Sequence, residues 1–289
     1  MFRLIKTNGV MGINMRNRKL IYPHNQQKHY KLADDKVECK NLLHKNGIAC
    51  AETYAVVRLH SQIPWAWKQC QEHEAVAIKP ANGCGGDGIL ILRKKQGLWF
   101  GSGRIFTDAD VKRHIANIIT GMYSMRSEDS CLIEACIIPH EFFGKIYGQG
   151  VPDFRVITLK GVPIMAMLRM PTSKSNGKAN LHQKGVGIGV DMNAGTLTQV
   201  YDGKTYSDNH PDNDRSIKGM KIPYWEELYE LSIRTAEIFP LEYLGIDIVI
   251  DQNLGPQIME VNVRPGLGIQ LVNKMGLQAA IDAHPKLTG

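Results

Sequence analysis

The stretch that decides the fold is GIDIVIDQNLGPQIMEVNVRPGL, residues 245–267. It contains two runs rich in β-branched and apolar residues, IDIVID and PQIMEVNV, with the turn-forming QNLG between them. Two such runs around a short turn predict an antiparallel hairpin. Side chains two residues apart on a strand share a face, so Glu260 and Asn262 point the same way. Asp247 on the partner strand can face them.

This hairpin gathers two carboxylates and an amide oxygen on an otherwise apolar ribbon. Burying such charges without a partner is costly, and Mg²⁺ binds oxygen ligands while leaving positions to water and phosphates. We therefore predict a metal site formed by Asp247, Glu260 and Asn262. The alternative is a solvated hairpin whose polar residues face water. Arg264, followed by Pro265-Gly266, favours the site because a cation beside the acids suits an anionic ligand.

The composition is that of a soluble globular protein. With 289 residues, the chain can bury a sizeable core and fits one two-lobed domain or two small ones. No apolar run approaches the ~20 residues of a membrane span. The N-terminus has no apolar signal-peptide region, so we expect a cytoplasmic protein and no membrane partner. The six cysteines show no CxxC or Cys/His metal spacing, which indicates reduced structural thiols.

The charge balance points to anionic partners. The formal net charge is +7, which favours ligands such as nucleotides or acidic peptides. The basic residues are scattered, and no block of lysine and arginine occurs. This distribution argues against a nucleic-acid partner.

A glycine-rich loop lies between two apolar runs in AVAIKPANGCGGDGILIL, residues 75–92. Glycine lets backbone N–H groups approach an anion closely, and successive N–H groups form an anion-binding nest. The loop is neither a Walker A loop nor a GxGxxG motif that opens a helix. A plain turn is the alternative interpretation. Lys79, just before the loop, favours phosphate binding.

A second hairpin is predicted over residues 153–170, with a turn at Lys160-Gly161. It carries Arg155 and Arg169, which suit a phosphate or carboxylate because guanidinium matches such groups in a bidentate way. The alternative is that both arginines pair with Asp153 or a neighbouring acid.

Residues 171–189 are polar, basic and glycine-rich. A loop this long in a compact domain is usually functional or disordered, and we interpret it as a lid over anions. His182 alone is a weak catalytic candidate, because histidines are common on exposed loops.

The remaining pattern predicts a strand or arm over residues 12–23 and a strand over 51–57. It predicts a further strand from residue 131 that ends at Pro139. Helices are expected over residues 37–47, 61–73, 107–124, 223–239 and 268–284. In the fourth of these helices, the apolar residues at helical spacing, Trp225 among them, are expected in the core.

Seven motifs occur in the order found in the ATP-grasp superfamily, which the chain resembles from about residue 34 to 271. They are the DDK that contains Lys36, AIKP with NGCGGDGI, LIEACI, DFR, LRM, NLHQKG, and DIVID with MEVNVRPGL. Within the superfamily, the chain most resembles the ribosomal-protein glutamate ligases and their α-L-glutamate ligase-like relatives. The resemblance implies an α+β fold, in which two α/β lobes with antiparallel sheets clasp ATP. The implied domains are an N-terminal arm or reduced segment (1–33), an N-terminal lobe (34–135) and a C-terminal lobe with the metal-binding hairpin (136–289).

The resemblance also implies a role for each matched residue. ATP would be held by two phosphate-binding lysines, the glycine loop, an adenine-binding hinge and a ribose-binding acid: Lys36, Lys79, Gly83, Gly85, Gly86, Gly88, Glu134, Ala135, Cys136, Ile137 and Glu141. Two Mg²⁺ ions, with Mn²⁺ as an alternative, would bind Asp247, Glu260 and Asn262, with Glu260 bridging them. The catalytic residues would be Arg155, Arg169, Asn180, His182 and Lys184. Cys84, inside the glycine loop, receives no covalent role.

The implied activity is an ATP-dependent carboxylate–amine ligase that forms an amide through an acyl phosphate. The expected partners are ATP, a carboxylate such as glutamate or another amino acid, and an amine or peptide acceptor; homo-oligomers are common in the superfamily. The alternatives are an ATP-grasp small-molecule kinase and a non-catalytic nucleotide-binding partner. Only 35 residues precede Lys36. We therefore expect the substrate pocket to be completed by the N-terminal arm, the loop from Pro171 or another subunit.

Overall fold

A computed structural model describes residues 9–83, 85–124 and 128–288. The chain divides into two compact units. Unit 1 comprises residues 1–34, 42–50 and 138–289, and unit 2 comprises residues 35–41 and 51–137. Cys84 lies outside the described residues. The domain boundaries expected at residues 34 and 136 stay a prediction.

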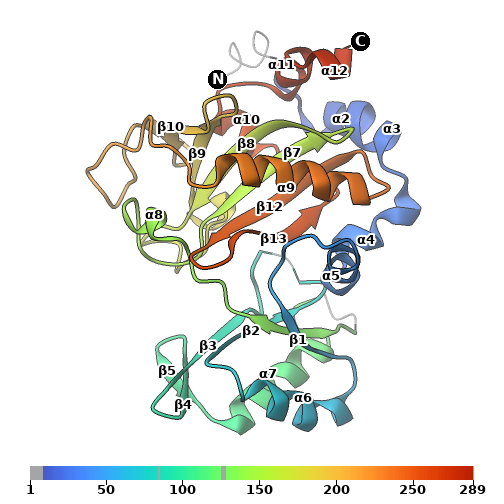
Figure 1. Cartoon of the computed structure of the whole chain (residues 1–289), viewed down its shortest axis with the longest axis vertical. Coiled ribbons are helices and arrows are strands. Elements are labelled where there is room, and N and C mark those ends of the chain that lie inside the picture. The colour runs from blue at the N-terminus through green and yellow to red at the C-terminus, as the bar shows by residue number, and fades with distance from the viewer. Residues whose placement is uncertain (1–8, 84, 125–127, 289) are drawn as a thin grey trace. The chain divides into compact units, whose positions relative to one another are not determined.

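Unit 2 is built on an antiparallel sheet, which has six strands in the described part of the chain. The strand order is β1-β6-β2-β3-β4-β5, so β6 returns from late in the sequence to lie between β1 and β2 (Figure 1). The strands are β1 (Thr53–Val57), β2 (Ala75–Pro80), β3 (Leu90–Lys95), β4 (Leu98–Gly101), β5 (Arg104–Phe106) and β6 (Cys131–Ala135).

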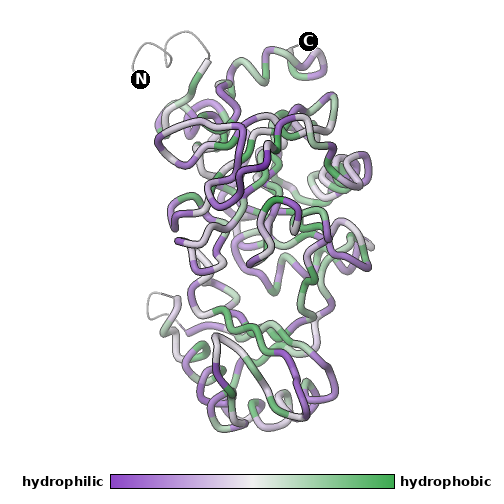
Figure 2. The backbone as a smooth tube through the Cα atoms, turned by 90° about the vertical axis from the view of Figure 1, so that its left-hand side faces the viewer, coloured by the Kyte–Doolittle hydropathy of each residue, from purple (hydrophilic) through white to green (hydrophobic). Residues whose placement is uncertain are grey.

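Helices of unit 2 pack against the apolar side of this sheet. They are α6 (Ile63–Cys70), which follows the short helix η3 (His60–Gln62), and α7 (Asp108–Ile119). The start of α5 (Lys36–Lys45) also belongs to unit 2. Trp67 of α6 and Ile115 of α7 are fully buried with Val76 and Ile78 of β2. Thr107 caps α7, and its hydroxyl accepts a hydrogen bond from Asp110 N. The strands expected at 51–57 and on both sides of the glycine loop, and the helices expected at 61–73 and 107–124, are confirmed, whereas β4 and β5 were not predicted and β6 ends at Ala135 and not at Pro139. The hydrophobic colouring of the strands in Figure 2 follows this core.

Unit 1 is built on a second antiparallel sheet, of seven strands within the described residues, in the order β11-β10-β9-β8-β7-β12-β13. Figure 1 shows α9 (Trp225–Ile238) crossing one face of it. The strands are β7 (Asp153–Leu159), β8 (Val162–Met170), β9 (Val186–Asp191), β10 (Thr196–Tyr201), β11 (Tyr206–Ser207), β12 (Tyr243–Asp251) and β13 (Gly255–Asn262). Both predicted hairpins, β7–β8 and β12–β13, are confirmed.

The segment expected as a strand over residues 12–23 is helical instead. It forms α2 (Ile13–Arg16), the π-helix η1 (Asn17–Ile21) and α3 (Tyr22–His24), followed by η2 (Gln27–His29) and α4 (Lys31–Asp34). The buried side chains are Arg16, Leu20 and Ile21, and the four-residue step from Arg16 to Leu20 is helical spacing. Ile13 and Met15 are exposed.

Two further expectations for unit 1 need correction. The predicted loop 171–189 ends sooner, because its last residues, from Val186, form β9; a short helix, η4 (Leu181–Gln183), lies within it. The C-terminal helix is split into α10 (Gly268–Val272) and α11 (Leu277–Asp282), followed by α12 (Pro285–Thr288). The helix is interrupted at Lys274 because the φ of this residue is 53°, a left-handed value that a continuous helix cannot contain. A short helix α8 (Glu141–Gly144) completes the unit.

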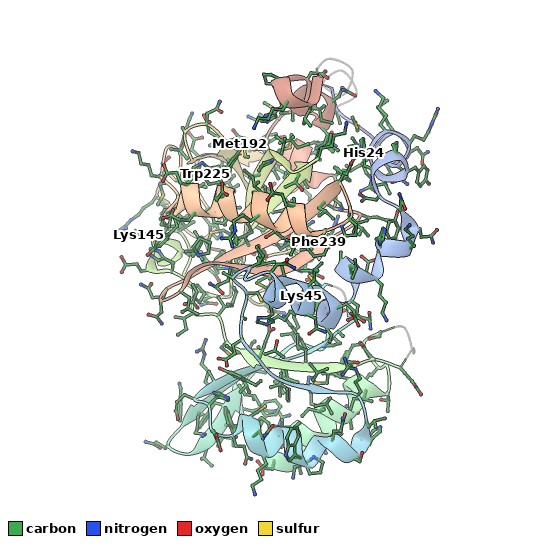
Figure 3. All side chains as sticks on the ribbon, turned by 45° about the vertical axis from the view of Figure 1, so that its right-hand side comes forward. His24, Lys45, Lys145, Met192, Trp225 and Phe239 are labelled. Carbon is green, nitrogen blue, oxygen red and sulfur yellow. The ribbon has the colours of Figure 1, made fainter. Side chains whose placement is uncertain are left out.

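The aromatic residue at the start of α9 is not in the core. Leu228 and Leu231 are buried as expected, but Trp225 is only partly buried. It lines a cavity of about 880 Å³ together with Met192 (Figure 3). Trp225 lies over Gly195, where a Cβ would come within 2.4 Å of the indole ring. The indole ring therefore packs on the turn between β9 and β10.

Candidate active site

In unit 2, Lys36 is held at the first turn of α5. Asp35 precedes the helix, and its Oδ1 accepts hydrogen bonds from Val37 N at 2.9 Å and Glu38 N at 3.2 Å. This is an N-cap, in which an acid just before the helix satisfies its free N–H groups. The Lys36 ammonium donates to the carbonyl oxygen of Gly83 at 2.9 Å. The structure therefore brings Lys36 to the start of the glycine loop.

The glycine loop has a backbone that other residues cannot adopt without strain. Gly85, Gly86 and Gly88 have φ angles of 65°, 75° and 77°. A Cβ at Gly83 would come within 2.4 Å of the Pro80 ring, and one at Gly88 within 2.5 Å of the Tyr123 ring. Positive φ at Gly85, Gly86 and Gly88 and close approach at Gly83 and Gly88 therefore favour glycine in this loop, while its anion-binding role stays a prediction.

The start of this loop is tied down by Asp129, which the sequence analysis missed. Its buried carboxylate accepts hydrogen bonds from the side-chain amide of Asn82 at 2.8 Å and from Asn82 N at 3.1 Å. It also accepts from the Ser124 hydroxyl and from Ser130 N at 2.7 Å. No local pattern signals this role, because an isolated acid in a polar segment is common.

Lys79 lies in a buried group of charges with Glu134 and Lys40. Its Nζ is 2.5 Å from Glu134 Oε1, and the Nζ of Lys40 pairs with Glu134 Oε2. All three residues are at most 6% exposed. Burial alone would raise the pKa of Glu134, but the ammonium groups of Lys79 and Lys40 outweigh it and the pKa is lowered. Lys40 was also missed by the sequence analysis.

The other hinge residues follow Glu134 at the end of β6. Ala135 N donates to the Glu52 carbonyl at 2.9 Å, and burial raises the pKa of the Cys136 thiol to about 11. Ile137 is the last residue of unit 2. Glu141 belongs to unit 1, where it is exposed at the first position of α8 and its N–H donates to Gln252 Oε1 at 2.7 Å. The adenine and ribose roles of these residues stay predictions.

In unit 1, the two predicted arginines converge on buried acids. Arg155 lies opposite Asp247 in the β7–β12 register, and Arg169 lies opposite Asp153 in the β7–β8 register. The Nη2 atoms of both arginines donate to Asp247 Oδ2 at 2.7 Å, and Arg169 Nε donates to Asp153 Oδ1 at 2.6 Å. The pairing alternative is thus what the structure shows. The structure does not test whether the two arginines also contact a substrate.

In this network, the pKa values of Asp153 and Asp247 are shifted in opposite directions. Burial raises the pKa of Asp153 to about 6, more than Arg169 can offset, and the nearby charge of Asp247 adds to the rise. Burial would also raise the pKa of Asp247, but Arg155 and Arg169 together lower it. Asp247 is therefore a stable anion, whereas Asp153 titrates at about pH 6.

The predicted metal ligands lie together on the β12–β13 hairpin. Asp247 is paired with Glu260 and Gly245 with Asn262 in the register, so all three oxygen-bearing side chains share one face. Asn262 Nδ2 donates to Asp247 Oδ2 at 3.4 Å, a long contact. Glu260 and Asn262 are partly exposed. Carboxylate and amide oxygens are ligands that suit Mg²⁺, although Asp247 is buried and already paired with Arg155 and Arg169.

A glycine on the same hairpin leaves room for this arrangement. A Cβ at Gly245 would come within 2.5 Å of the Pro265 ring and 3.2 Å of Arg155 Cδ. Within the described residues, no group of three or more His, Cys, Asp and Glu is placed to hold a metal. The predicted set has only two such residues, and its metal role stays a prediction.

The other catalytic candidates lie in the loop before β9. Asn180 caps η4, and its Oδ1 accepts from His182 N at 3.1 Å. Lys184 has a left-handed φ of 69°, and its carbonyl accepts from the Thr172 hydroxyl at 2.8 Å. The side chains of His182 and Lys184 are exposed. The loop is therefore folded on itself and presents a basic surface.

The N-terminal arm reaches the residues that follow the hairpin. Arg16 is buried and its Nη1 donates to the Pro265 carbonyl at 2.8 Å. The guanidinium of Arg264 lies over the Tyr30 ring at 4.8 Å from its centroid. The arm thus contacts the Arg-Pro-Gly turn, while its part in a substrate pocket stays a prediction.

Two antiparallel sheets, a glycine loop with two lysines and an acidic hairpin define an ATP-grasp fold. The chain belongs to the Sugar-transfer associated ATP-grasp family, which it matches over residues 15–284. The superfamily and the α+β fold are thereby confirmed. The narrower resemblance to glutamate ligases stays a prediction. No curated protein matches the sequence.

Solved structures share the fold at low sequence identity. Biotin carboxylase from Campylobacter jejuni, in complex with β,γ-ATP, aligns with a TM-score of 0.53 and 14% identity over 84% of this chain. The chain spans 42% of that protein. D-cycloserine synthetase DcsG aligns with a TM-score of 0.49 and 12% identity, over 86% of this chain and 68% of that one.

D-alanine–D-alanine ligase from Bacillus anthracis aligns with a TM-score of 0.46 and 13% identity, over 82% of this chain and 58% of that one.

None of the described helices is long and apolar enough to cross a membrane.

Proposed function

We propose that this protein is an ATP-dependent carboxylate–amine ligase that forms an amide through an acyl phosphate. The observation that supports it best is the cluster on β7, β8, β12 and β13. There, Arg155 and Arg169 lie beside the acidic face of Asp247 and Glu260. Such a combination of cations and metal-binding acids suits a reaction in which a carboxylate must approach a triphosphate.

The residues of unit 2 would bind the nucleotide. Lys36 and Lys79 neutralise phosphate oxygens, and the N–H groups of the glycine loop donate to them. Asp129 keeps the start of the loop in one conformation by holding Asn82. A loop that is already ordered binds with a smaller loss of conformational entropy. Adenine would contact the backbone of residues 134–137. The ribose would bind Glu141, which belongs to unit 1.

The residues of unit 1 would act on the reacting groups. Arg155 and Arg169 orient the carboxylate and reduce its repulsion from the γ-phosphate. Asp247, Glu260 and Asn262 would hold Mg²⁺, which when bound neutralises phosphate charge. The loop with Asn180, His182 and Lys184 adds donors and positive charge.

The reaction balances without a protein nucleophile. A carboxylate oxygen attacks the γ-phosphorus, the bond to the β-phosphate oxygen breaks, and ADP leaves. The amine nitrogen then attacks the acyl carbon, inorganic phosphate leaves, and the amine loses a proton. Positioning and charge stabilisation therefore account for catalysis.

The substrates we propose are an amino acid such as glutamate as the carboxylate and an amine or peptide as the acceptor. The family description adds sugar transfer, so an amino sugar is a further acceptor to test. The use of ATP favours the cytoplasm as the location of this protein.

The test is Mg²⁺-dependent ATP hydrolysis across a panel of amino acids, short peptides and amino sugars, with mass spectrometry of the products. We expect phosphate release that needs both a carboxylate and an amine, and a product heavier by one residue. A stable phosphoester would instead show a kinase. Tight ATP binding without turnover on any substrate would favour a non-catalytic role and contradict the proposal.

A further inference from the structure

The first observation is a lysine buried inside unit 2 on the second turn of α5. Lys40 is 5% exposed, and its Nζ donates to the Ala51 carbonyl at 2.5 Å. It also forms an ion pair with Glu134. Lysines are almost never fully buried unless paired, because removing an ammonium group from water is costly. A burial of this kind needs a reason in the fold or in the site.

The second observation is that Glu134 forms ion pairs with two lysines at once. Lys40 pairs with its Oε2 and Lys79 with its Oε1, at 2.5 Å for the latter. The three residues come from α5, β2 and β6, so the carboxylate links three elements of unit 2. The side chains of Lys40, Lys79 and Glu134 are 6%, 7% and 8% exposed. The geometry of each lysine therefore depends on the same glutamate.

The division of Glu134 between two lysines affects how Lys79 can bind an anion. An ammonium group has three donors, and only one is needed for Glu134. If Lys40 were absent, Lys79 and Glu134 would form a one-to-one pair, and an incoming phosphate would have to compete with a whole carboxylate. With Lys40 on the other oxygen, part of that negative charge is already neutralised, and Lys79 is held in place yet can still donate to phosphate.

The hydrogen bond from Lys40 to the Ala51 carbonyl holds the lysine side chain at a second contact. Ala51 lies just before β1, which pairs with β6 beside Glu134, since Thr53 is opposite Glu134 in the register. Lys40 is thus anchored to the backbone that borders the glutamate. A long, flexible side chain held at both contacts can set the position of a carboxylate.

We propose that Lys40 is a positioning residue of the nucleotide site, which holds Glu134 so that Glu134 orients Lys79 toward the phosphates of ATP. This inference rests on the proposed ATP-dependent function. Lys40 acts through Glu134 and does not itself contact the nucleotide. The lowered pKa of Glu134 agrees with this role, because both lysines keep the carboxylate charged.

The experiment measures the Kd of Mg·ATP by calorimetry for the wild type, Lys40→Met and Lys40→Arg. Lys45→Met is the matched control, because Lys45 is exposed on the same helix. We expect Lys40→Met to raise Kd by about tenfold, the effect of one charged hydrogen bond. At saturating ATP, kcat should change little. Lys40→Arg should recover most of the affinity, and Lys45→Met should equal the wild type.

A pH series separates positioning from a merely structural role. Without Lys40, the pKa of Glu134 rises, so the loss of ATP affinity on acidification should begin at a higher pH than in the wild type. A Lys40→Met protein with wild-type Kd and pH profile would overturn the inference alone. A wild type that does not bind ATP would overturn the proposed function and the inference with it.

A second pair of variants covers the case in which Lys40→Met does not fold. In a Glu134→Gln background, adding Lys40→Met should leave Kd unchanged, because Lys40 acts through Glu134. A further loss of affinity in the double variant would mean that Lys40 meets the nucleotide directly, and the inference would be wrong.

Discussion

Arg155 on β7 and Asp247 on β12 lie directly opposite each other and form a buried ion pair, in which Arg155 Nη2 donates to Asp247 Oδ2 at 2.7 Å. The same oxygen accepts from Arg169, so two guanidinium groups depend on one carboxylate. Asp247 is also the first predicted metal ligand. The acid is therefore placed where structural pairing and ligand binding compete.

The first prediction concerns the stability of this group. Asp247→Asn leaves two buried guanidinium groups without their shared anion, and we expect a loss of about 3 kcal/mol in the free energy of unfolding, as for one partner of a buried pair. Urea denaturation measures it. Asp208→Asn is the control, because Asp208 faces Lys218 at 3.9 Å in an exposed pair and should change stability by less than about 1 kcal/mol. Equal losses in both variants would contradict a special role for Asp247.

The second prediction concerns the metal. Glu260→Gln keeps the shape of the side chain but removes a charge from the acidic face of β13, so we expect Mg²⁺-dependent ATP turnover to fall by about 100-fold or more. Glu260 is partly exposed, and the fold should persist by circular dichroism. Glu237→Gln, at an exposed position of α9, is the control. Normal turnover in Glu260→Gln would show that Glu260 is not a metal ligand.

The sequence was most informative where a local pattern sets the structure. The β12–β13 hairpin and the positions of Asp247, Glu260 and Asn262 on one face follow from an alternation of period two, which the register confirms. Asp35 as the N-cap of α5 follows from capping rules in the same way. These features depend on neighbours in sequence, so no knowledge of the whole fold is needed.

The sequence was least informative where distant segments meet. Lys40 and Asp129 are ordinary polar residues until the sheet order brings β6 beside β2 and places Glu134 and Asn82 next to them. The prediction of a strand or arm over residues 12–23 was wrong for a related reason, because the few apolar residues of this segment fit a strand as well as a helix. The burial of Arg16 against the Pro265 carbonyl decides between them, and that contact is tertiary.

The third prediction tests the glycine loop with two residues of similar φ. Gly88 and Gly97 have φ angles of 77° and 79°, but only Gly88 has neighbours that a Cβ would meet. Alanine at either position costs roughly 1–2 kcal/mol for the left-handed backbone. Gly88→Ala must also displace Tyr123, so we expect a larger loss of stability and weaker ATP binding. Gly97→Ala should bind ATP normally, and equal behaviour of the two variants would contradict a special role for the loop.

The last prediction concerns pH and Asp153. Its folded pKa of about 6 lies above the ordinary value of 3.8, so between these values the folded protein binds more protons at this site than the unfolded chain. The contribution of Asp153 to stability is therefore favourable at low pH and falls as pH rises through the window of about 4 to 6. Asp247, whose pKa is lowered, stays charged throughout this window.

Asp153→Asn removes the titrating group and makes the prediction measurable. The unfolding free energy of the wild type minus that of Asp153→Asn, from urea denaturation at several pH values, should decrease by on the order of 2 kcal/mol between pH 4 and 6.5. The ion pair with Arg169 forms only when Asp153 is charged, so its effect is already contained in the folded pKa and therefore in this slope. A difference that is flat or rises with pH would mean that Arg169 outweighs burial and that Asp153 is a permanent anion.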